Sequence, residues 1–269
     1  MDLVGTAAYY ASRVWDARGR LWRERPAYVV VALALFVGAA SGRVLIELIE
    51  QLLFKQELGT VDRWVFQALQ AVRTEPVEAF FAATTHLGDT WMLIGVVAVG
   101  VAALLVMRRR AEAAVITAVF VLAATSVALM KVMLQRARPD DALHLVPASG
   151  AAFPSGHASL SFVAYLLLAY LVVRQLNSMR GYVIFGAAVI LSLVIGLSRL
   201  VLGVHWLSDV LAGYALAGLW VSVGITMIEF IRHFQPAPVL DSGRRRLAGW
   251  TIGTLVLLIF GFATYQVLR

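Results

Sequence analysis

Seven long apolar stretches constrain this chain more than any other feature of its sequence. A helix that crosses a bilayer needs about 20 consecutive, mostly apolar residues, because its backbone must satisfy its own polar groups. The chain is 61% hydrophobic and only 14% charged, whereas a soluble domain carries about 25% charged residues. We therefore predict an all-α, polytopic membrane bundle. The candidate spans are Ala27 to Ile46, Trp91 to Met107, Ala113 to Met133, Ala158 to Val173, Tyr182 to Leu197, Trp206 to Ile228 and Ala248 to Leu268.

The apolar stretches divide the chain into three predicted parts. Residues 1–26 form a polar, Arg-rich cytoplasmic arm. Residues 27–232 hold six of the spans and are the predicted membrane domain. Residues 233–269 hold a linker and an additional C-terminal span, which carries none of the polar motifs described below. The first apolar stretch is longer than the core of about 7–15 residues in a signal peptide, so we interpret it as a retained span.

The basic residues predict the orientation of the spans. Arginines precede the first span, follow the second, and lie between the fourth and fifth and between the sixth and seventh. If the spans alternate, all these positions share one side, which the positive-inside rule makes cytoplasmic. The Ala-, Val- and Arg-rich composition hints at a bacterial source, and we expect the protein in the bacterial cytoplasmic (inner) membrane. The net charge of +7 does not indicate a nucleic-acid partner, because the cations lie between apolar runs rather than along one solvated face.

A shorter segment between the first two spans has the pattern of an amphipathic helix. Apolar residues recur at helical spacing from Val61 to Val72, and Asp62, Gln70 and Arg73 lie on the opposite face. We expect a helix that Pro76 breaks. It either lies on the outer leaflet or packs on the spans without touching lipid, and the sequence leaves both arrangements open.

Four polar clusters interrupt the apolar chain between residues 131 and 209, and the predicted orientation puts all of them at the outer membrane face. Each cluster lies at the edge of a span. Together they supply three fixed cations, two histidines and a carboxylate, which suits a phosphate-handling site. The clusters are Lys131 with Arg138-Pro139, Pro154-Ser155-Gly156-His157, Ser198-Arg199, and His205 with Asp209.

The first two clusters have a local interpretation as anion-binding elements. Lys131 and Arg138 are seven residues apart, so on one helix that Pro139 ends they would face the same way. Ser155 is a favoured N-cap residue, and Gly156 allows close approach to the free N–H groups of a helix start. His157 would lie in the first turn. Taken singly, cations that reach the headgroups and a capped helix explain these residues as well.

The last two clusters point to a nucleophile. Arg199 offers a fork of donors that suits phosphate oxygens. His205 and Asp209 have i, i+4 spacing, so we expect them on one face of the sixth span. A carboxylate there can hold one imidazole nitrogen protonated and leave the other free to attack. His144, and His86 with Asp89, are interpreted as loop residues rather than catalytic ones.

The complete pattern is Lys131-x6-Arg138-Pro139, then Pro154-Ser155-Gly156-His157, then Ser198-Arg199-x5-His205-x3-Asp209. It closely resembles the three-part signature of the type 2 phosphatidic acid phosphatase superfamily and matches every signature position. The resemblance implies that His205 is the nucleophile and forms a phosphohistidine, that Asp209 orients it, and that His157 is the general acid. It also implies that Lys131, Arg138 and Arg199, with Ser155 and the Gly156 amide, bind the phosphoryl oxygens.

The resemblance implies a membrane lipid phosphatase that removes the terminal phosphate of a lipid phosphate or diphosphate at the outer membrane face. Its partners would be that substrate and the membrane lipids. An isoprenyl diphosphate is the favoured substrate, and phosphatidylglycerophosphate, phosphatidic acid and a lipid A phosphate stay open. Two alternatives remain: a non-catalytic lipid transporter on the same scaffold, and an enzyme like the vanadium haloperoxidases, which share the phosphate cradle but are soluble.

The sequence predicts activity that needs no metal and no cofactor. Three cations and a helix N-terminus can stabilise a phosphoryl group, and the chain shows no carboxylate cluster of the kind that binds Mg²⁺. Phosphate release from a lipid phosphate should therefore continue at its full rate in excess EDTA. Loss of release on chelation, with recovery on adding Mg²⁺, would contradict the prediction.

Overall fold

The computed structural model of this chain describes residues 27–55, 58–176, 178–234 and 243. The predicted arm over residues 1–26 and the seventh span from Ala248 to Leu268 lie outside the described residues. The helices are α2 (Ala27–Glu50), α3 (Leu58–Ala71), α4 (Glu75–Thr85), α5 (Thr90–Val106), α6 (Arg110–Leu134), α7 (Gly156–Leu176), α8 (Met179–Val201) and α9 (Leu207–Phe234). A π turn (Gln51–Lys55) and two 3-10 turns (His86–Gly88 and Asp141–Leu143) separate some of them.

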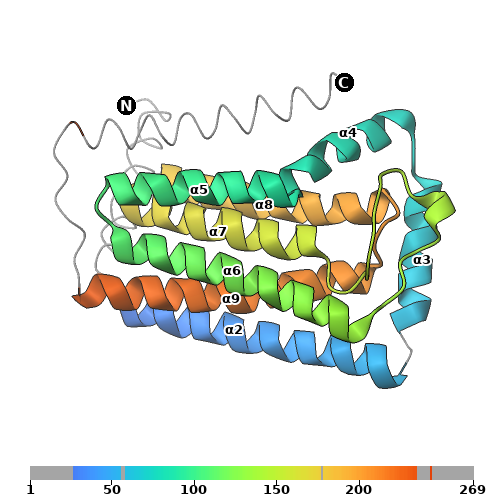
Figure 1. Cartoon of the computed structure of the whole chain (residues 1–269), viewed down its shortest axis with the longest axis horizontal. Helices are drawn as coiled ribbons and strands as arrows, with labels where there is room; N and C mark the ends of the chain where they lie inside the picture. Colours follow the sequence, from blue (N-terminus) through green and yellow to red (C-terminus); the bar gives the residue numbers. More distant parts are fainter. Residues whose placement is uncertain (1–26, 56–57, 177, 235–242, 244–269) are drawn as a thin grey trace, which may run out of the picture.

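The fold is an all-α membrane bundle, as predicted. Helices α2 and α5 to α9 run along one axis, and α3 crosses the end of the bundle (Figure 1). Among the described residues, five helices are long and apolar enough to cross a bilayer. A sixth span results if α4 and α5, which meet at a bend of 50°, form one broken span. The division of the chain at residues 26 and 232 remains a prediction.

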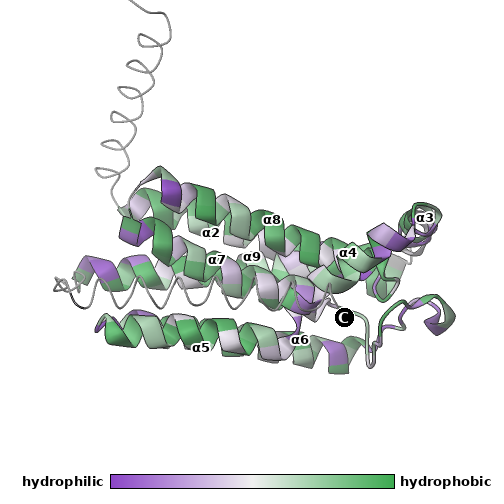
Figure 2. Cartoon of the chain, turned by 90° about the horizontal axis from the view of Figure 1, so that it is seen from above, coloured by the Kyte–Doolittle hydropathy of each residue, from purple (hydrophilic) through white to green (hydrophobic). Residues whose placement is uncertain are grey.

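Helix α7 lies at the centre of the bundle and α2 at its edge. Two thirds (67%) of the most apolar window of α7 is buried, against 6% for α2. Most of the outer surface is apolar as well, and the hydrophilic residues gather at the two ends (Figure 2). Phe36 and Trp91, for example, are 72% and 83% exposed. Such a surface suits lipid, because hydrocarbon tails are as apolar as the side chains that meet them.

A buried set of ion pairs fastens the end of the bundle opposite the predicted clusters. Glu112 of α6 pairs with Arg109 and with Arg232 of α9, and Glu229 of α9 pairs with Arg174 of α7. Both glutamates are under 5% exposed. A buried charge is tolerated only when it is paired. The pairs therefore compensate the buried charges at this end, and they also link α6, α7 and α9.

Helix α3 docks on the bundle through a face that includes polar residues, and it exposes several apolar side chains. Asp62 is 2% exposed, whereas Trp64 is 69% exposed and Val72 is 58% exposed. Arg73 donates from Nε to the carbonyl of Val201 at 2.8 Å. The helix therefore packs on the spans, and Asp62 and Arg73, which the sequence placed on the solvated side, take part in the contact. Leu69 packs on a buried cluster of the bundle, and the ring of Phe66 contacts that of Trp206. The exposed apolar residues, which include Val61, Trp64 and Val72, suit a bilayer surface.

Two helix boundaries differ from the sequence predictions. Helix α6 ends at Leu134, with Gln135 in the left-handed region at φ 43°, and not at Pro139. Lys131 and Arg138 are therefore not on one helix. A proline ring clashes with the carbonyl four residues earlier, here that of Gln135, so it can end a helix well ahead of its own position. Likewise, Pro76 begins α4 rather than only ending the helix before it.

Candidate functional site

The predicted site residues meet around one pocket of about 370 Å³ at the end of the bundle that α3 crosses. Part of its lining, Pro147, Ala148 and Ser149, comes from the loop between α6 and α7. The structure places six of the eight predicted residues in its lining: Lys131, Arg138, Gly156, His157, Arg199 and His205. The remaining two, Ser155 and Asp209, are completely buried and lie behind the lining.

The ends of four long helices bring these residues together. Lys131 comes from the last turn of α6, His157 from the first turn of α7, and Arg199 from the last turn of α8. Close packing of α9 on the start of α7 aligns two of these ends. A Cβ atom at Gly213 would lie 2.7 Å from the carbonyl oxygen of Ser155, so only glycine allows this approach. The Ser155 N–H in turn donates to the Asp209 carbonyl at 2.9 Å.

His205 lies in the turn before α9, because α9 begins at Leu207 and not at His205. Its predicted partner is nevertheless in place: Nδ1 lies 3.3 Å from Oδ2 of Asp209. The same Oδ2 accepts the Trp206 N–H at 2.8 Å, which ties the carboxylate to the turn. A carboxylate in the third helical position often caps its own helix in this way. The cap, rather than a shared helical face, brings the pair together.

The second ring nitrogen of His205 faces the cations. Nε2 lies 3.3 Å from Nη1 of Arg138. A guanidinium has only donors, so Nε2 accepts this hydrogen bond with its lone pair and the ring proton is on Nδ1, toward Asp209. His205 is 3% exposed, and burial lowers its pKa against the opposing effect of Asp209. The ring is therefore neutral at neutral pH and presents a nucleophilic nitrogen to the pocket.

Two of the cations, Arg138 and Lys131, also hold nearby backbone segments in place through hydrogen bonds. Arg138 donates from Nε to the carbonyl of Gly150 at 2.9 Å and from Nη1 to that of Val204 at 2.6 Å. Burial lowers the pKa of Arg138, and Asp209 opposes the shift; an arginine stays charged in either case. Lys131 donates from Nζ to the carbonyl of Ala151. These bonds hold the loop after α6 over the site.

The third cation keeps donors free for a ligand. Arg199 is 6% exposed and donates from Nη1 to the hydroxyl of Thr85 at 2.6 Å. Among the described residues, its Nε and the hydroxyl of Ser155 have no hydrogen-bond partner. Ser155 thus precedes α7 without capping it through its side chain. The partnerless Nε of Arg199 belongs to a cation that lines the pocket.

Asp89, which the sequence led us to interpret as a loop residue, contacts one of the predicted site residues. Its Oδ1 lies 3.0 Å from Nε2 of His157, and its Oδ2 lies 2.8 Å from Nδ1 of His86. The carboxylate of Asp89, which belongs to none of the four predicted clusters, therefore fixes the orientation of the His157 ring. The backbone at Gly88 packs closely against the His157 ring, because a Cβ atom at Gly88 would lie 2.9 Å from that ring. His144 binds the Pro139 carbonyl at 3.2 Å and remains a loop residue.

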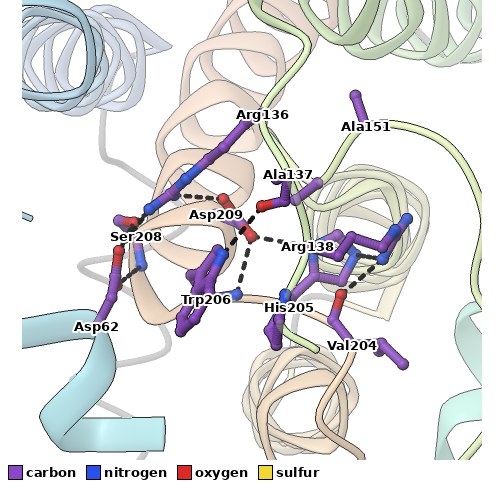
Figure 3. A network of polar contacts seen from close by, with 12 residues as sticks. Asp62, Arg136, Ala137, Arg138, Ala151, Val204, His205, Trp206, Ser208 and Asp209 are labelled. Atoms are coloured by element: carbon purple, nitrogen blue, oxygen red, sulfur yellow. Dashed lines mark hydrogen bonds and ion pairs between the residues drawn. The ribbon is translucent and has the colours of Figure 1, made fainter. Parts of the chain in front are cut away.

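Two further residues, Asp62 and Arg136, were not singled out as site residues. Arg136 lies between the carboxylates of Asp62 and Asp209, at 2.6 and 2.5 Å (Figure 3). The signal available in the sequence was a second arginine inside the Lys131–Arg138 segment. Asp62 carried no such signal, because an acidic residue on an amphipathic helix is usually solvated.

Within the described residues, no group of three or more His, Cys, Asp or Glu side chains could hold a metal ion. The polar side chains of the pocket lining are three cations, two imidazoles and the hydroxyls of Thr90 and Ser149, and no carboxylate is among them. Such a set attracts an anion, and a metal ion prefers carboxylate oxygens or thiolates.

Comparison with known proteins finds a matching family model and a similar curated protein. The family model described as "PAP2 superfamily" matches residues 111–232, a range that includes every predicted site residue. Phosphatidylglycerophosphatase B of Bacillus subtilis (strain 168) is 28% identical over 178 residues, which cover 65% of this chain and 87% of that protein.

Two solved structures are similar. The transmembrane PAP2-type phosphatidylglycerolphosphate phosphatase from Bacillus subtilis has a TM-score of 0.68 at 24% identity, and the match covers 74% of this chain and all (100%) of that chain. LpxE from Aquifex aeolicus has a TM-score of 0.49 at 20% identity, with 63% of this chain and 94% of that chain covered. The first of these likenesses confirms the fold.

The pocket predicts that inorganic phosphate binds the protein and stabilises it. A ligand at 100 times its dissociation constant adds about 2.7 kcal/mol to the free energy of unfolding, so phosphate should raise the unfolding temperature of the protein in detergent. Arg199→Gln should remove most of the rise. Arg43→Gln, which changes an exposed arginine on α2, is the matched control and should keep it. An equal rise in both variants would place phosphate elsewhere.

Proposed function

We propose that this chain, which belongs to the PAP2 superfamily, is a membrane lipid phosphatase whose pocket removes the terminal phosphate of a lipid phosphate or diphosphate. One observation carries the proposal: the unprotonated nitrogen of His205 faces Arg138 within a pocket that Lys131 and Arg199 also line. A nucleophile and three cations around one cavity are the parts that phosphoryl transfer needs, because its catalysis is mostly positioning and charge stabilisation.

The proposed reaction has two steps. In the first, Nε2 of His205 attacks the terminal phosphorus, an N–P bond forms, and the P–O bond to the lipid breaks. His157 gives its proton to the departing oxygen, so the lipid leaves as an alcohol or as a phosphate. In the second step, water attacks the phosphorus of phosphohistidine, His157 takes a proton from that water, and the N–P bond breaks to release inorganic phosphate. General acid catalysis of this kind is typically worth roughly 10²–10⁴-fold.

The other predicted residues have supporting roles in this mechanism. Asp209 holds the Nδ1 proton of His205 and stabilises the charge that develops on the ring. Lys131, Arg138 and Arg199 neutralise the phosphoryl oxygens, and the start of α7 at Gly156 adds the positive end of a helix dipole. Ser155 lies behind the pocket lining, so we assign this residue a positioning role: its N–H donates to the carbonyl of Asp209.

The substrate that we favour is an isoprenyl diphosphate. A diphosphate carries more negative charge than a phosphate monoester, and the three cations of the pocket suit it. Phosphatidylglycerophosphate is the second candidate, because the similar Bacillus subtilis protein is named as a phosphatase for that class of lipid. The transporter alternative is less consistent with the site, since the nucleophile, its carboxylate and the acid all meet around the pocket.

Phosphate release from purified protein tests the function. The panel should contain an isoprenyl diphosphate, phosphatidylglycerophosphate, phosphatidic acid and a lipid A phosphate. We expect the wild type to release phosphate from at least one of them and His205→Ala to release none. The ranking of kcat/KM across the panel identifies the substrate. Equal release by wild type and His205→Ala would exclude the histidine mechanism, and lipid flipping that persists in His205→Ala would support a transporter.

We further propose that the site faces the periplasm and the N-terminus the cytoplasm. Arg109, Arg174 and Arg232 lie at the opposite end of the bundle from the pocket, as the positive-inside rule requires of the cytoplasmic end.

Single cysteines test this orientation, because the chain has none of its own. Ala148 lines the pocket and Ala111 lies at the start of α6. An impermeant thiol reagent added outside cells should label Ala148→Cys and not Ala111→Cys. The reverse pattern would overturn the orientation.

A further inference from the structure

A buried guanidinium links the surface helix α3 to the partner of the nucleophile. Arg136 donates from Nη1 to Oδ1 of Asp209 at 2.5 Å and from Nη2 to Oδ2 of Asp62 at 2.6 Å (Figure 3). The side chain of Arg136 is 12% exposed, and those of the two aspartates are 0% and 2% exposed. Charge-assisted hydrogen bonds of this length in a poorly solvated place are strong and directional.

The two oxygens of Asp209 have separate tasks. Oδ2 accepts from Nδ1 of His205 and from the Trp206 N–H, and Oδ1 accepts from Arg136. Rotation of the carboxylate about its own axis would break the bond to Arg136. The guanidinium therefore fixes the plane of the carboxylate, and this plane decides where the Nδ1 proton of His205 points.

Asp62 fixes Arg136 in turn. It accepts the Ser208 N–H at 2.9 Å and the Ser208 hydroxyl at 2.6 Å, and that hydroxyl also accepts from Arg136 at 2.6 Å. Asp62 thus caps the start of α9 from another helix and closes a ring with Arg136 and Ser208. Without Asp62, the guanidinium of Arg136 would have Asp209 as its only carboxylate partner in this ring. It would then draw more of the negative charge of Asp209 away from His205.

We propose that Arg136 and Asp62 are positioning residues of the phosphatase reaction, which hold Asp209 in the orientation and charge state that activates His205. This inference rests on the proposed function. Neither residue lines the pocket, so both act through Asp209 and not on the phosphate. A purely structural role, in which the ring only fastens α3, makes a different kinetic prediction.

A double-mutant cycle separates the two roles. The full chain in detergent is assayed with the lipid phosphate that the wild type hydrolyses best. Arg136→Met should lower kcat about 10–100-fold and change KM less than about twofold, because ground-state binding is untouched. In an Asp209→Asn background it should lower kcat less than about twofold further, since residues that act as one unit are not additive. Losses that multiply would overturn the proposal.

A milder variant keeps the test decisive if Arg136→Met does not fold or Asp209→Asn has no measurable activity. Asp62→Asn keeps the shape of the side chain and removes its charge. We expect a kcat about 5–10-fold below wild type at unchanged KM, because only the electrostatic part of the link is lost. Arg136→Lys, which keeps the charge but not the fork, should lie between Arg136→Met and wild type. A wild-type kcat in Asp62→Asn would overturn the proposal.

Arg73 supplies the matched control. It also fastens α3 to the bundle, through the carbonyls of Val201 and Leu143, and it does not contact Asp209. Arg73→Met should keep the kcat of the wild type even if it lowers the unfolding temperature. A loss equal to that of Arg136→Met would mean that docking of α3 alone matters, and would contradict the proposal.

The wild type and His205→Ala, assayed beside these variants, separate failure of this inference from failure of the proposed function. If the wild type releases no phosphate from any lipid of the panel, the proposed function fails, and the positioning role fails with it. If the wild type is active, His205→Ala is inactive, and Arg136→Met and Asp62→Asn match the wild type, the function stands and only the positioning role is wrong.

Discussion

The carboxylate of Asp209 is the contact on which the site depends. It is fully buried, and it binds His205, the N–H of Trp206 and the guanidinium of Arg136. A buried charge in a membrane protein must be paired, because neither water nor lipid can compensate it. That requirement brings the turn before α9, the loop after α6 and, through Asp62, helix α3 to one point. The geometry of His205 follows from this pairing and not from helical periodicity.

The same requirement explains how charge is distributed over the molecule. The buried ion pairs lie at the two ends of the bundle, and the middle of the long helices is packed from apolar and small residues. At one end Glu112 and Glu229 are saturated by arginines. At the other end Lys131, Arg138 and Arg199 line the pocket, and within the described residues none of the three forms an ion pair with a carboxylate. The first end is a structural fastening, and the second is arranged to receive an anion.

The sequence predicted most of the fold and six of the residues that line the pocket. Hydropathy alone predicted the long helices, because a bilayer leaves few alternatives to an apolar helix. The motif spacing identified six residues that line the pocket. The errors concern helix ends and weak amphipathic patterns. Pro139 ends α6 earlier than expected, and Asp62, which looked solvated, is buried against Arg136. Both depend on contacts between segments distant in the chain, which periodicity does not record.

By itself, the sequence determined the class of this protein and the residue types from which we propose the chemistry of its site. Long apolar runs require a membrane bundle, and three cations with two histidines favour a phosphate ligand whatever the packing. Only the tertiary structure decided which nitrogen of His205 faces the pocket, which carboxylates hold it and which face of α3 meets the protein. The physical reason is that burial and pairing of charge are properties of neighbours in space. Asp62 and Arg136 lie 74 residues apart in sequence and 2.6 Å apart in the folded chain.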